Sequence, residues 1–481
     1  MFVLALIPLA LFTTLLVFTK SRLLWTSLLT FFVTCGLVFF AWHMNAAAIQ
    51  TSVWKGITIA FDILLIIVGA VFFLETLNSA HIIRRLCIYL ETFSKDYRIQ
   101  ALLLAWFLES FFEGTAGFGA PLTIVAPLLV GIGLAPMQAL VVTLLGNSAS
   151  GIFGAAGTPI RTGLAGLPIL NVPLYAATLN LVGFLVPVFM LWTVTRSQKK
   201  ENVQFFEALP FALVSGLAFV VPSVLLVPLG QEFPTILGSV IGLLIMLLFI
   251  KFGFLVPKTT RTLKEEHLPH DTMPLYKVFI PYGLLISLMV GGKFMVGSFN
   301  PGFAFVVAAL PVLLLWKEKT LSIKTVVLTS LKRSWEPFVV IAAVSAMVQL
   351  MINSGQNSAQ LPSILDTMTR NLPYDILHFL SPAIGAFGSF VTGSTTVSNI
   401  MFGGLLKQAA ENAGYGVTLI LSLQLVGAAA GNMISIADVL PAQAVVGLNG
   451  REREVIRKVL LPCITYVTLI ILAGMLLEMV L

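Results

Sequence analysis

Long apolar segments recur along this chain, and they constrain its fold more than any other feature. A helix needs about 20 apolar residues to cross the hydrocarbon core of a bilayer. Runs close to that length include residues 23–41, 57–74, 170–194, 206–229 and 459–481. Hydrophobic residues make up 58% of the chain and charged residues only 10%. We therefore predict an all-α polytopic membrane protein with about 12 transmembrane helices and no separate soluble module.

The remaining composition does not favour metal, disulfide or cofactor chemistry. Cys35, Cys87 and Cys463 are isolated in or beside apolar runs and are interpreted as small core residues. His267 and His270, in the segment "HLPH", could form a metal pair, although a solvated loop is the favoured interpretation. We expect no metal, no cofactor and no nucleic-acid partner.

Basic residues gather in particular loops and predict the topology. The net charge of +7 fits a membrane protein whose positive loops face the cytoplasm. If every basic loop is cytoplasmic, the full spans alternate without conflict and both chain ends lie outside. The groups lie near residues 20–22, 84–98, 196–200, 251–277, 317–333 and 451–458.

Three polar motifs occur in the same order in both halves of the chain. "LETLNSA" ends an apolar run at residue 80, and "QLMINSG" ends another at residue 355. "FEGTAGFGA" in the first half corresponds to "VTGSTTVSN" in the second, and "LLGNSAS" corresponds to "AAGNMIS". Each pair alone is weak, but three pairs in one order indicate an internal repeat.

The basic loops predict that the two copies are inverted. A basic group follows the Asn78 helix of the first copy but precedes the Asn353 helix of the second. Equivalent helices then cross the membrane in opposite directions, as in many secondary transporters. We predict a first inverted-topology repeat at residues 1–200, linking helices and a cytoplasmic loop at 201–277, and a second repeat at 278–481.

Glycine-rich and hydroxyl-rich stretches interrupt the apolar segments at matching places. Irregular backbone inside a membrane survives only where protein or a water-filled cavity satisfies its polar groups. We therefore predict two re-entrant hairpins with tips near residues 113–121 and 392–399, and broken helices near 146–159 and 431–441. Half-helix N-termini at such breaks suit an anion, so these segments predict a transport site.

The same motifs resemble the lactate permease family. They are "RIQALLLAWFLESFFEGTAGFGAP" at residues 98–121, "FGAAGTPI" at 153–160, "FVTGSTTVSN" at 390–399, and "GNMIS" with "VVGLNG" within 431–450. The similarity runs from about Asp62 to the C-terminus. It implies a proton symporter that imports lactate, glycolate or similar 2-hydroxy monocarboxylates across a prokaryotic inner membrane.

The chain departs from the usual family pattern at several positions. Thr395 stands where the family has Asp, and Asn432 stands where it has Lys. Ile436, Ala437 and Asp438 replace a Pro-Gln-Ser run, and Arg161 replaces an apolar residue. Asp438 and Arg161 could compensate for the missing charges. Because of these changes, sodium coupling stays open as an alternative to proton coupling.

Glu113 is the main candidate for proton coupling. An acid inside a membrane is costly and is functional by default, although this carboxylate could instead cap the hairpin tip. Glu109 lies one helical turn earlier on the same face and could share a proton with it or pair with a base. Asp62, Glu75 and Asp438 are further buried-acid candidates.

The expected substrate ligands are small polar residues and glycines at the predicted breaks. Hydrogen bonding between helices is the alternative role for any single Ser or Thr, and Arg161 could clamp a carboxylate or mark a membrane surface. The set is Gly114, Thr115, Gly117, Gly119, Asn147, Ser148, Ser150, Arg161, Thr392, Gly393, Ser394, Thr395, Ser398, Asn399, Asn432 and Ser435.

Other classes of protein fit the sequence less well. A passive anion channel would need rings of charges or carbonyls around an open pore. An intramembrane enzyme would need a catalytic motif, and the chain contains neither H-E-x-x-H nor a G-x-S-x-G elbow. We expect a non-enzymatic secondary transporter in the lipid bilayer that works by alternating access, with an elevator motion favoured by analogy alone. A homodimer is possible, but the sequence does not decide the oligomeric state.

Overall fold

The computed structural model describes residues 1–18, 22–117, 119–196, 201–263, 274–296, 300–315, 322–370 and 372–480. His267, His270 and several basic residues of the predicted cytoplasmic loops (Lys20, Lys199, Lys200, Lys264, Lys317 and Lys319) lie outside these ranges. Among the described residues, Cys463 is buried and Cys35 half-buried, and both are free.

Helices make up almost all of the described secondary structure, which confirms the all-helical fold class; one isolated bridge joins Met44 and Asn357. Ten of the described helices are long and apolar enough to cross a membrane. Shorter apolar helices lie at Phe2–Leu16, Ala120–Gly131 and Pro301–Leu314. We predicted about 12 transmembrane helices, and the described residues contain ten long ones together with these three shorter apolar helices.

The helices follow one another in four groups along the chain. The first group is α1 (Phe2–Phe18), α2 (Leu23–Phe40), α3 (Ala46–Ser79) and α4 (Ile82–Phe93). The second is α5 (Tyr97–Leu102), a π-helical turn (Leu103–Leu108), α6 (Glu109–Thr115), α7 (Ala120–Gly131), α8 (Pro136–Ser150) and α9 (Gly154–Arg161). The third is α10 (Val172–Leu179), α11 (Val186–Thr195), α12 (Glu201–Leu226), α13 (Pro234–Phe252), α14 (Leu275–Val296) and α15 (Pro301–Leu315). The last is α16 (Ile323–Asn353), α17 (Ile364–Thr369), α18 (Leu377–Thr392), α19 (Thr395–Ala413), α20 (Val417–Asn432), α21 (Ile436–Val445) and α22 (Glu452–Val480).

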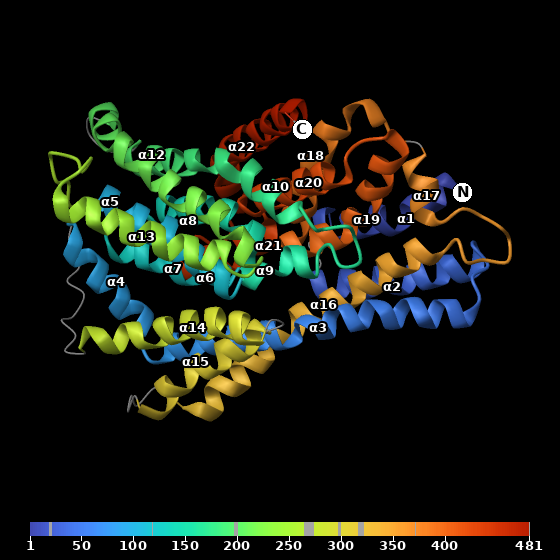
Figure 1. Ribbon diagram of the computed structural model, residues 1–481, viewed down its shortest axis with the longest axis horizontal. Coiled ribbons are helices and arrows are strands. Elements are labelled where there is room, and N and C mark those ends of the chain that lie inside the picture. The colour runs from blue at the N-terminus through green and yellow to red at the C-terminus, as the bar shows by residue number, and fades with distance from the viewer. Residues whose placement is uncertain are drawn as a thin grey trace.

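Two long helices, α3 and α16, form one side of the molecule. They pack against each other, and α2 packs on α16 while α15 packs on α3 and α14 on α15. Figure 1 shows these helices as a layer along the lower side, with the remaining helices above them. This layer therefore stands beside the body that carries the polar motifs.

The centre of that body is built from the two segments with Gly-Asn breaks. In Pro136–Arg161 the membrane-length apolar stretch is completely buried inside the protein, and in Val417–Val445 it is 89% buried. Both shares are higher than in any other described span. Helices α8 and α20 contact each other directly. The other helices thus surround the two segments that carry Asn147 and Asn432.

Contacts around this centre are reciprocal between the two halves. Helices α6 and α7 pack on α8, and α18 and α19 pack on α20. In addition, α9 contacts α19 while α21 contacts α7. In each half, the short helix that follows the central helix therefore packs against the second hairpin helix of the other half: α9 follows α8 and packs on α19, and α21 follows α20 and packs on α7.

The backbone leaves helical geometry where each central segment is interrupted. After α8, a 3-10 turn at Gly151–Phe153 leads to Ala155, Ala156 and Gly157, whose φ angles are +42°, +54° and +81°. Left-handed geometry costs a non-glycine residue about 1–2 kcal/mol, so this break is held by its surroundings. After α20, Ser435 starts a new helix and accepts a hydrogen bond from Asp438 N at 3.2 Å.

The two hairpin-like turns use left-handed glycines in the same way. Between α6 and α7, Gly117 and Gly119 have φ of +58° and +71°. Between α18 and α19, Gly393 has φ of +71°, and Ser394 caps α19 by accepting a hydrogen bond from Val397 N at 3.2 Å. Glycine adopts these angles without steric penalty, so the chain can reverse its direction within a few residues at both turns.

Candidate functional site

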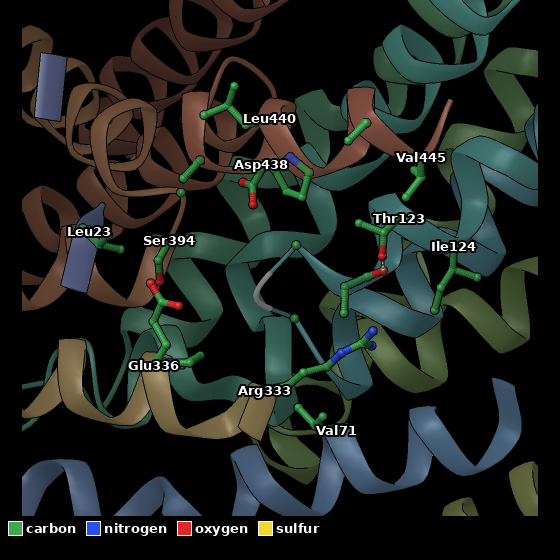
Figure 2. A pocket seen from close by; sticks show the side chains of 18 of the residues that line it. Leu23, Val71, Thr123, Ile124, Arg333, Glu336, Ser394, Asp438, Leu440 and Val445 are labelled. Carbon is green, nitrogen blue, oxygen red and sulfur yellow. Dashed lines mark hydrogen bonds between the residues drawn. The ribbon is translucent and has the colours of Figure 1, made fainter. Parts of the chain in front are cut away.

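Two neighbouring cavities lie where these turns meet. The larger one, here called the vestibule, has a volume of about 1930 Å³ and is bounded by α3, α4, α7, α16, α21 and α22. Figure 2 shows Asp438 and Leu440 on one side of it and Arg333 and Glu336 on the other. The smaller one, here called the inner cavity, has a volume of only about 20 Å³.

One asparagine in the first half holds two carboxyl groups. Asn147 Nδ2 donates hydrogen bonds to Glu109 Oε1 and Glu113 Oε2, each at 2.8 Å. The two glutamates are 0% and 6% exposed, and their spacing on α6 places them on one face. Glu109 Oε2 has no hydrogen-bond partner among the described residues. The Asn147 amide therefore bridges the two carboxyl groups.

The carboxyl group of Glu113 lies against bare backbone. A Cβ on Gly154 would come within 2.5 Å of Glu113 Oε1, so a side chain at residue 154 would displace the carboxyl group. On the other side of the pair, a Cβ on Gly146 would meet Ala105 O at 1.9 Å. Gly154 thus makes room for the Glu113 carboxyl group, and Gly146 makes room for the backbone of the π-helical turn.

Asn432 has the corresponding position in the second half. Its Nδ2 donates a hydrogen bond to Thr395 Oγ1 at 3.0 Å, and its Oδ1 has no partner among the described residues. A Cβ on Gly151 would lie 3.0 Å from Asn432 Nδ2 and 3.4 Å from Thr395 Oγ1. The break after α8 therefore touches the second half's asparagine.

Side-chain hydrogen bonds connect α9 to the start of α19. The hydroxyl groups of Thr158 and Thr396 are 3.2 Å apart. Asn399 Nδ2 donates to Pro159 O at 3.0 Å, and Gln424 Nε2 donates to Asn399 Oδ1 at 3.1 Å. All of these groups are buried, so the bonds fix the position of α9 against the second half.

Asp438 lies beside both glycine turns. A Cβ on Gly119 would come within 2.6 Å of Asp438 Oδ1, and a Cβ on Gly393 within 3.6 Å. The residue is 6% exposed. Its carboxyl group therefore occupies the place where the two turns approach each other.

The structure gathers part of the predicted ligand set around the inner cavity. The predicted residues in its wall are Glu113, Gly117, Gly119, Asn147, Gly393, Ser394, Thr395 and Asn432. The wall also contains Asp438, which was predicted as a buried acid but not as a ligand, and further residues outside the predicted ligand set, namely Gly151, Gly154, Ala155, Thr158, Pro159 and Thr396. The dense Gly/Pro run "FGAAGTPI" was the available signal for most of these.

Other predicted ligands make local contacts instead. Gly114 packs against Thr235 and Ile236 of α13. The hydroxyl groups of the predicted Ser and Thr residues mostly donate to nearby carbonyl oxygens. These bonds join Thr115 to Phe112, Ser148 to Leu145, Ser150 to Gly146, Thr392 to Gly388 and Ser398 to Gly385.

Three further charged candidates lie away from the inner cavity. Arg161 donates to Glu232 Oε2 at 3.3 Å, and its side chain is 28% exposed. Glu75 is buried and pairs with Arg333 at the vestibule wall. The prediction that Asp62 is buried is wrong, because this residue is exposed on the outer face of α3.

Polar, unwound backbone at the centre of a fold with ten membrane-length helices among its described residues is typical of membrane transport proteins. The family model for L-lactate permease matches residues 1–293 and 293–481. The chain therefore belongs to the L-lactate permease family. It is a transport protein and not an enzyme, and it is a multi-pass protein of the prokaryotic inner membrane.

Individual relatives agree with this assignment. The chain is 28% identical over 438 residues to the L-lactate permease of Bacillus subtilis (strain 168), with 75% of each chain covered. It is 27% identical over 434 residues to the glycolate permease GlcA of Escherichia coli (strain K12), again with 75% of each covered. The solved Alcanivorax borkumensis YdaH transporter has a similar fold, with a TM-score of 0.53, 10% identity, and 94% and 98% of the two chains covered.

Proposed function

We propose that this protein imports a small 2-hydroxy monocarboxylate, such as lactate or glycolate, together with a proton. The observation that carries the proposal is the meeting of both halves' polar breaks around one cavity. That cavity offers hydrogen-bond partners for a hydroxy acid beside a carboxyl pair that can hold a proton. The two relatives named above are permeases for substrates of this class.

The substrate carboxylate binds at the start of α19. The first N–H groups of a helix have no partner within the helix, and the helix dipole favours negative charge there. Thr395 and Thr396 provide such groups and belong to the cavity wall. The unsatisfied Asn432 Oδ1 accepts a hydrogen bond from the substrate's 2-hydroxyl group. An acid without this hydroxyl would leave a buried acceptor unpaired.

The transported proton binds at the pair Glu109 and Glu113. Two ionised carboxylates that share one Asn147 donor in a water-poor site repel each other. One proton on the pair removes that repulsion and supplies a donor where Glu109 Oε2 has none. Because Glu113 also lines the inner cavity, its charge state acts directly on an anion bound there.

The conformation corresponds to an inward-facing state with a closed inner cavity. About 20 Å³ admits roughly one water molecule, so a hydroxy acid enters only when Gly117 and Gly119 move apart from Gly393 and Ser394. The open vestibule is walled by basic residues from loops predicted to be cytoplasmic. These residues are Arg22, Arg84, Lys332, Arg333 and Arg453.

Alternating access follows from two inverted repeats with re-entrant hairpins. The reciprocal contacts of α9 with α19 and of α21 with α7 support this arrangement. The layer of α3 and α16 serves as a scaffold, and the body containing both hairpins moves against it in an elevator motion (Figure 1).

Purified protein in liposomes tests the proposal. An inward proton gradient should drive labelled lactate or glycolate above its external concentration, and a protonophore should abolish this accumulation. Accumulation that follows a sodium gradient without a pH gradient would assign sodium as the coupling ion instead. Flux that never exceeds equilibrium under either gradient would identify a passive channel and refute symport.

A further inference from the structure

Asp438 lies between the two cavities and lines both of them. The described residues that line both the vestibule and the inner cavity are Gly117, Gly119, Gly393, Ser394 and Asp438. Among these five, only Asp438 can carry a charge. We call this shared set the neck, because a solute that passes from the vestibule to the inner cavity must pass these residues.

The neck is shaped around the Asp438 carboxyl group. A Cβ on residue 119 would lie 2.6 Å from Asp438 Oδ1. The glycine leaves that space free for the carboxyl group. On the opposite turn, the corresponding distance from Gly393 is 3.6 Å. Ser435 caps α21 and accepts a hydrogen bond from the Asp438 backbone N at 3.2 Å, which fixes the start of this helix. The carboxyl group therefore lies close to the glycines of both turns.

The charged groups around Asp438 are unevenly distributed. On the inner side, Glu113 lines the same cavity and Glu109 lies behind it on α6. The packed helices α7, α8 and α18 contribute no charged side chain to either wall. On the vestibule side, α3, α4, α16, α22 and the start of α2 contribute groups of both signs. These are Glu75, His81, Arg84, Lys332, Arg333, Glu336, Glu452, Arg453 and Arg22.

We propose that Asp438 is a gate acid that must take up a proton before the substrate anion can pass the neck. The ionised carboxylate repels an anion at short range in a narrow passage of low dielectric. After it takes a proton from vestibule water, it is neutral and donates a hydrogen bond to the passing carboxylate. The proton returns to water when the gate ionises again. This inference rests on the proposed anion transport and concerns a residue distinct from the Glu109 and Glu113 pair.

Exchange of labelled for unlabelled lactate in liposomes, with equal pH on both sides, tests the gate without a driving gradient. Above its pKa a single acid loses its protonated fraction about tenfold per pH unit. The exchange rate of the wild type should therefore fall steeply toward alkaline pH. Asp438→Asn is permanently neutral, so its exchange rate should fall with pH much less steeply than the wild-type rate, because only the Glu109 and Glu113 pair still titrates.

Two further variants separate the gate from other titrating groups. Asp375→Asn changes an exposed acid that lines neither cavity and should keep the wild-type pH profile. Glu113→Gln should still show an exchange rate that falls with pH, because its gate acid is intact. If Asp438→Asn does not give monodisperse protein, Asp438→Ser provides a second small neutral side chain for the same measurement.

The outcomes distinguish this inference from the proposed function. An Asp438→Asn protein that keeps the steep wild-type pH profile would overturn the gate, as would a wild type whose exchange does not vary with pH. Both results would leave lactate transport in place. A wild type that exchanges neither lactate nor glycolate at any pH would overturn the proposed function and the gate together.

Discussion

Asn432 and Thr395 are joined by a hydrogen bond of 3.0 Å from Nδ2 to Oγ1. These are the two positions at which this chain lacks the base and the acid of the usual lactate permease pattern. At these positions a neutral donor, Asn432, and a neutral acceptor, Thr395, stand where the family pattern has Lys and Asp. We therefore interpret the two departures as one coupled change. This pair carries no charge, and Arg161 pairs with Glu232.

This contact predicts a double-mutant effect at residues 395 and 432. Thr395→Asp or Asn432→Lys alone would bury an unpaired charge and lower the free energy of unfolding by about 3–5 kcal/mol. The double variant Thr395→Asp/Asn432→Lys should recover most of that loss, because the two charges meet. Thermal stability of the purified protein, followed by size-exclusion chromatography, measures the coupling. Strictly additive losses would show that the two side chains do not interact.

Glu113→Gln is expected to separate proton coupling from substrate binding. The amide keeps the size of the side chain but cannot carry the proton. Gradient-driven accumulation of lactate should therefore fall to the equilibrium level, while exchange of labelled for unlabelled lactate continues. Both are measured in the same liposomes. Full concentrative uptake by this variant would refute the role of Glu113.

Close contact at Gly146 predicts a strong steric effect on the central segment. A methyl group there would meet the backbone oxygen of Ala105 at 1.9 Å. Gly146→Ala should therefore lower the free energy of unfolding by about 1–3 kcal/mol or more, as overpacking does. Gly36→Ala on α2 is the matched control, because nothing lies within 4 Å of its added methyl group. Equal thermal stability of the two variants would contradict the tight contact of α8 with the π-helical turn.

Arg98 is predicted to anchor the start of the first hairpin. Its fully buried guanidinium contacts Asp96 Oδ2 at 2.7 Å and Glu207 Oε2 at 3.2 Å, and it also donates to the carbonyl oxygens of Gln204 and Thr259. Arg98→Met would leave Asp96 buried without its cation, at a cost of about 3–5 kcal/mol.

The expected result for Arg98→Met is loss of monodisperse protein at a much lower temperature than for the wild type. Arg370→Met, which changes an exposed arginine at the end of α17, should behave like the wild type. If both variants melt together with the wild type, the cluster around Arg98 does not stabilise the fold.

Several features of the site could be predicted because they depend on local chemistry. The repeated Asn147 and Asn432 motifs indicated both breaks in the central segments, since Gly-rich polar stretches cannot continue an apolar helix. Gly117 and Gly393 indicated turns for the same reason. The partners of the polar groups could not be predicted in this way. Arg161, for example, pairs with Glu232 of a distant segment, and no periodicity relates those two positions.

The amino-acid sequence by itself determined the class of the protein, because apolar length and charge depletion are sufficient to place helices in a membrane. It also determined where those helices are interrupted. Only the tertiary structure decided which polar groups meet: that Asn147 binds both glutamates, that Asn432 binds Thr395, and that Asp438 stands between the two glycine turns. The physical reason is that these contacts join helices far apart in the chain, and their geometry follows from packing around the buried centre and not from any local preference.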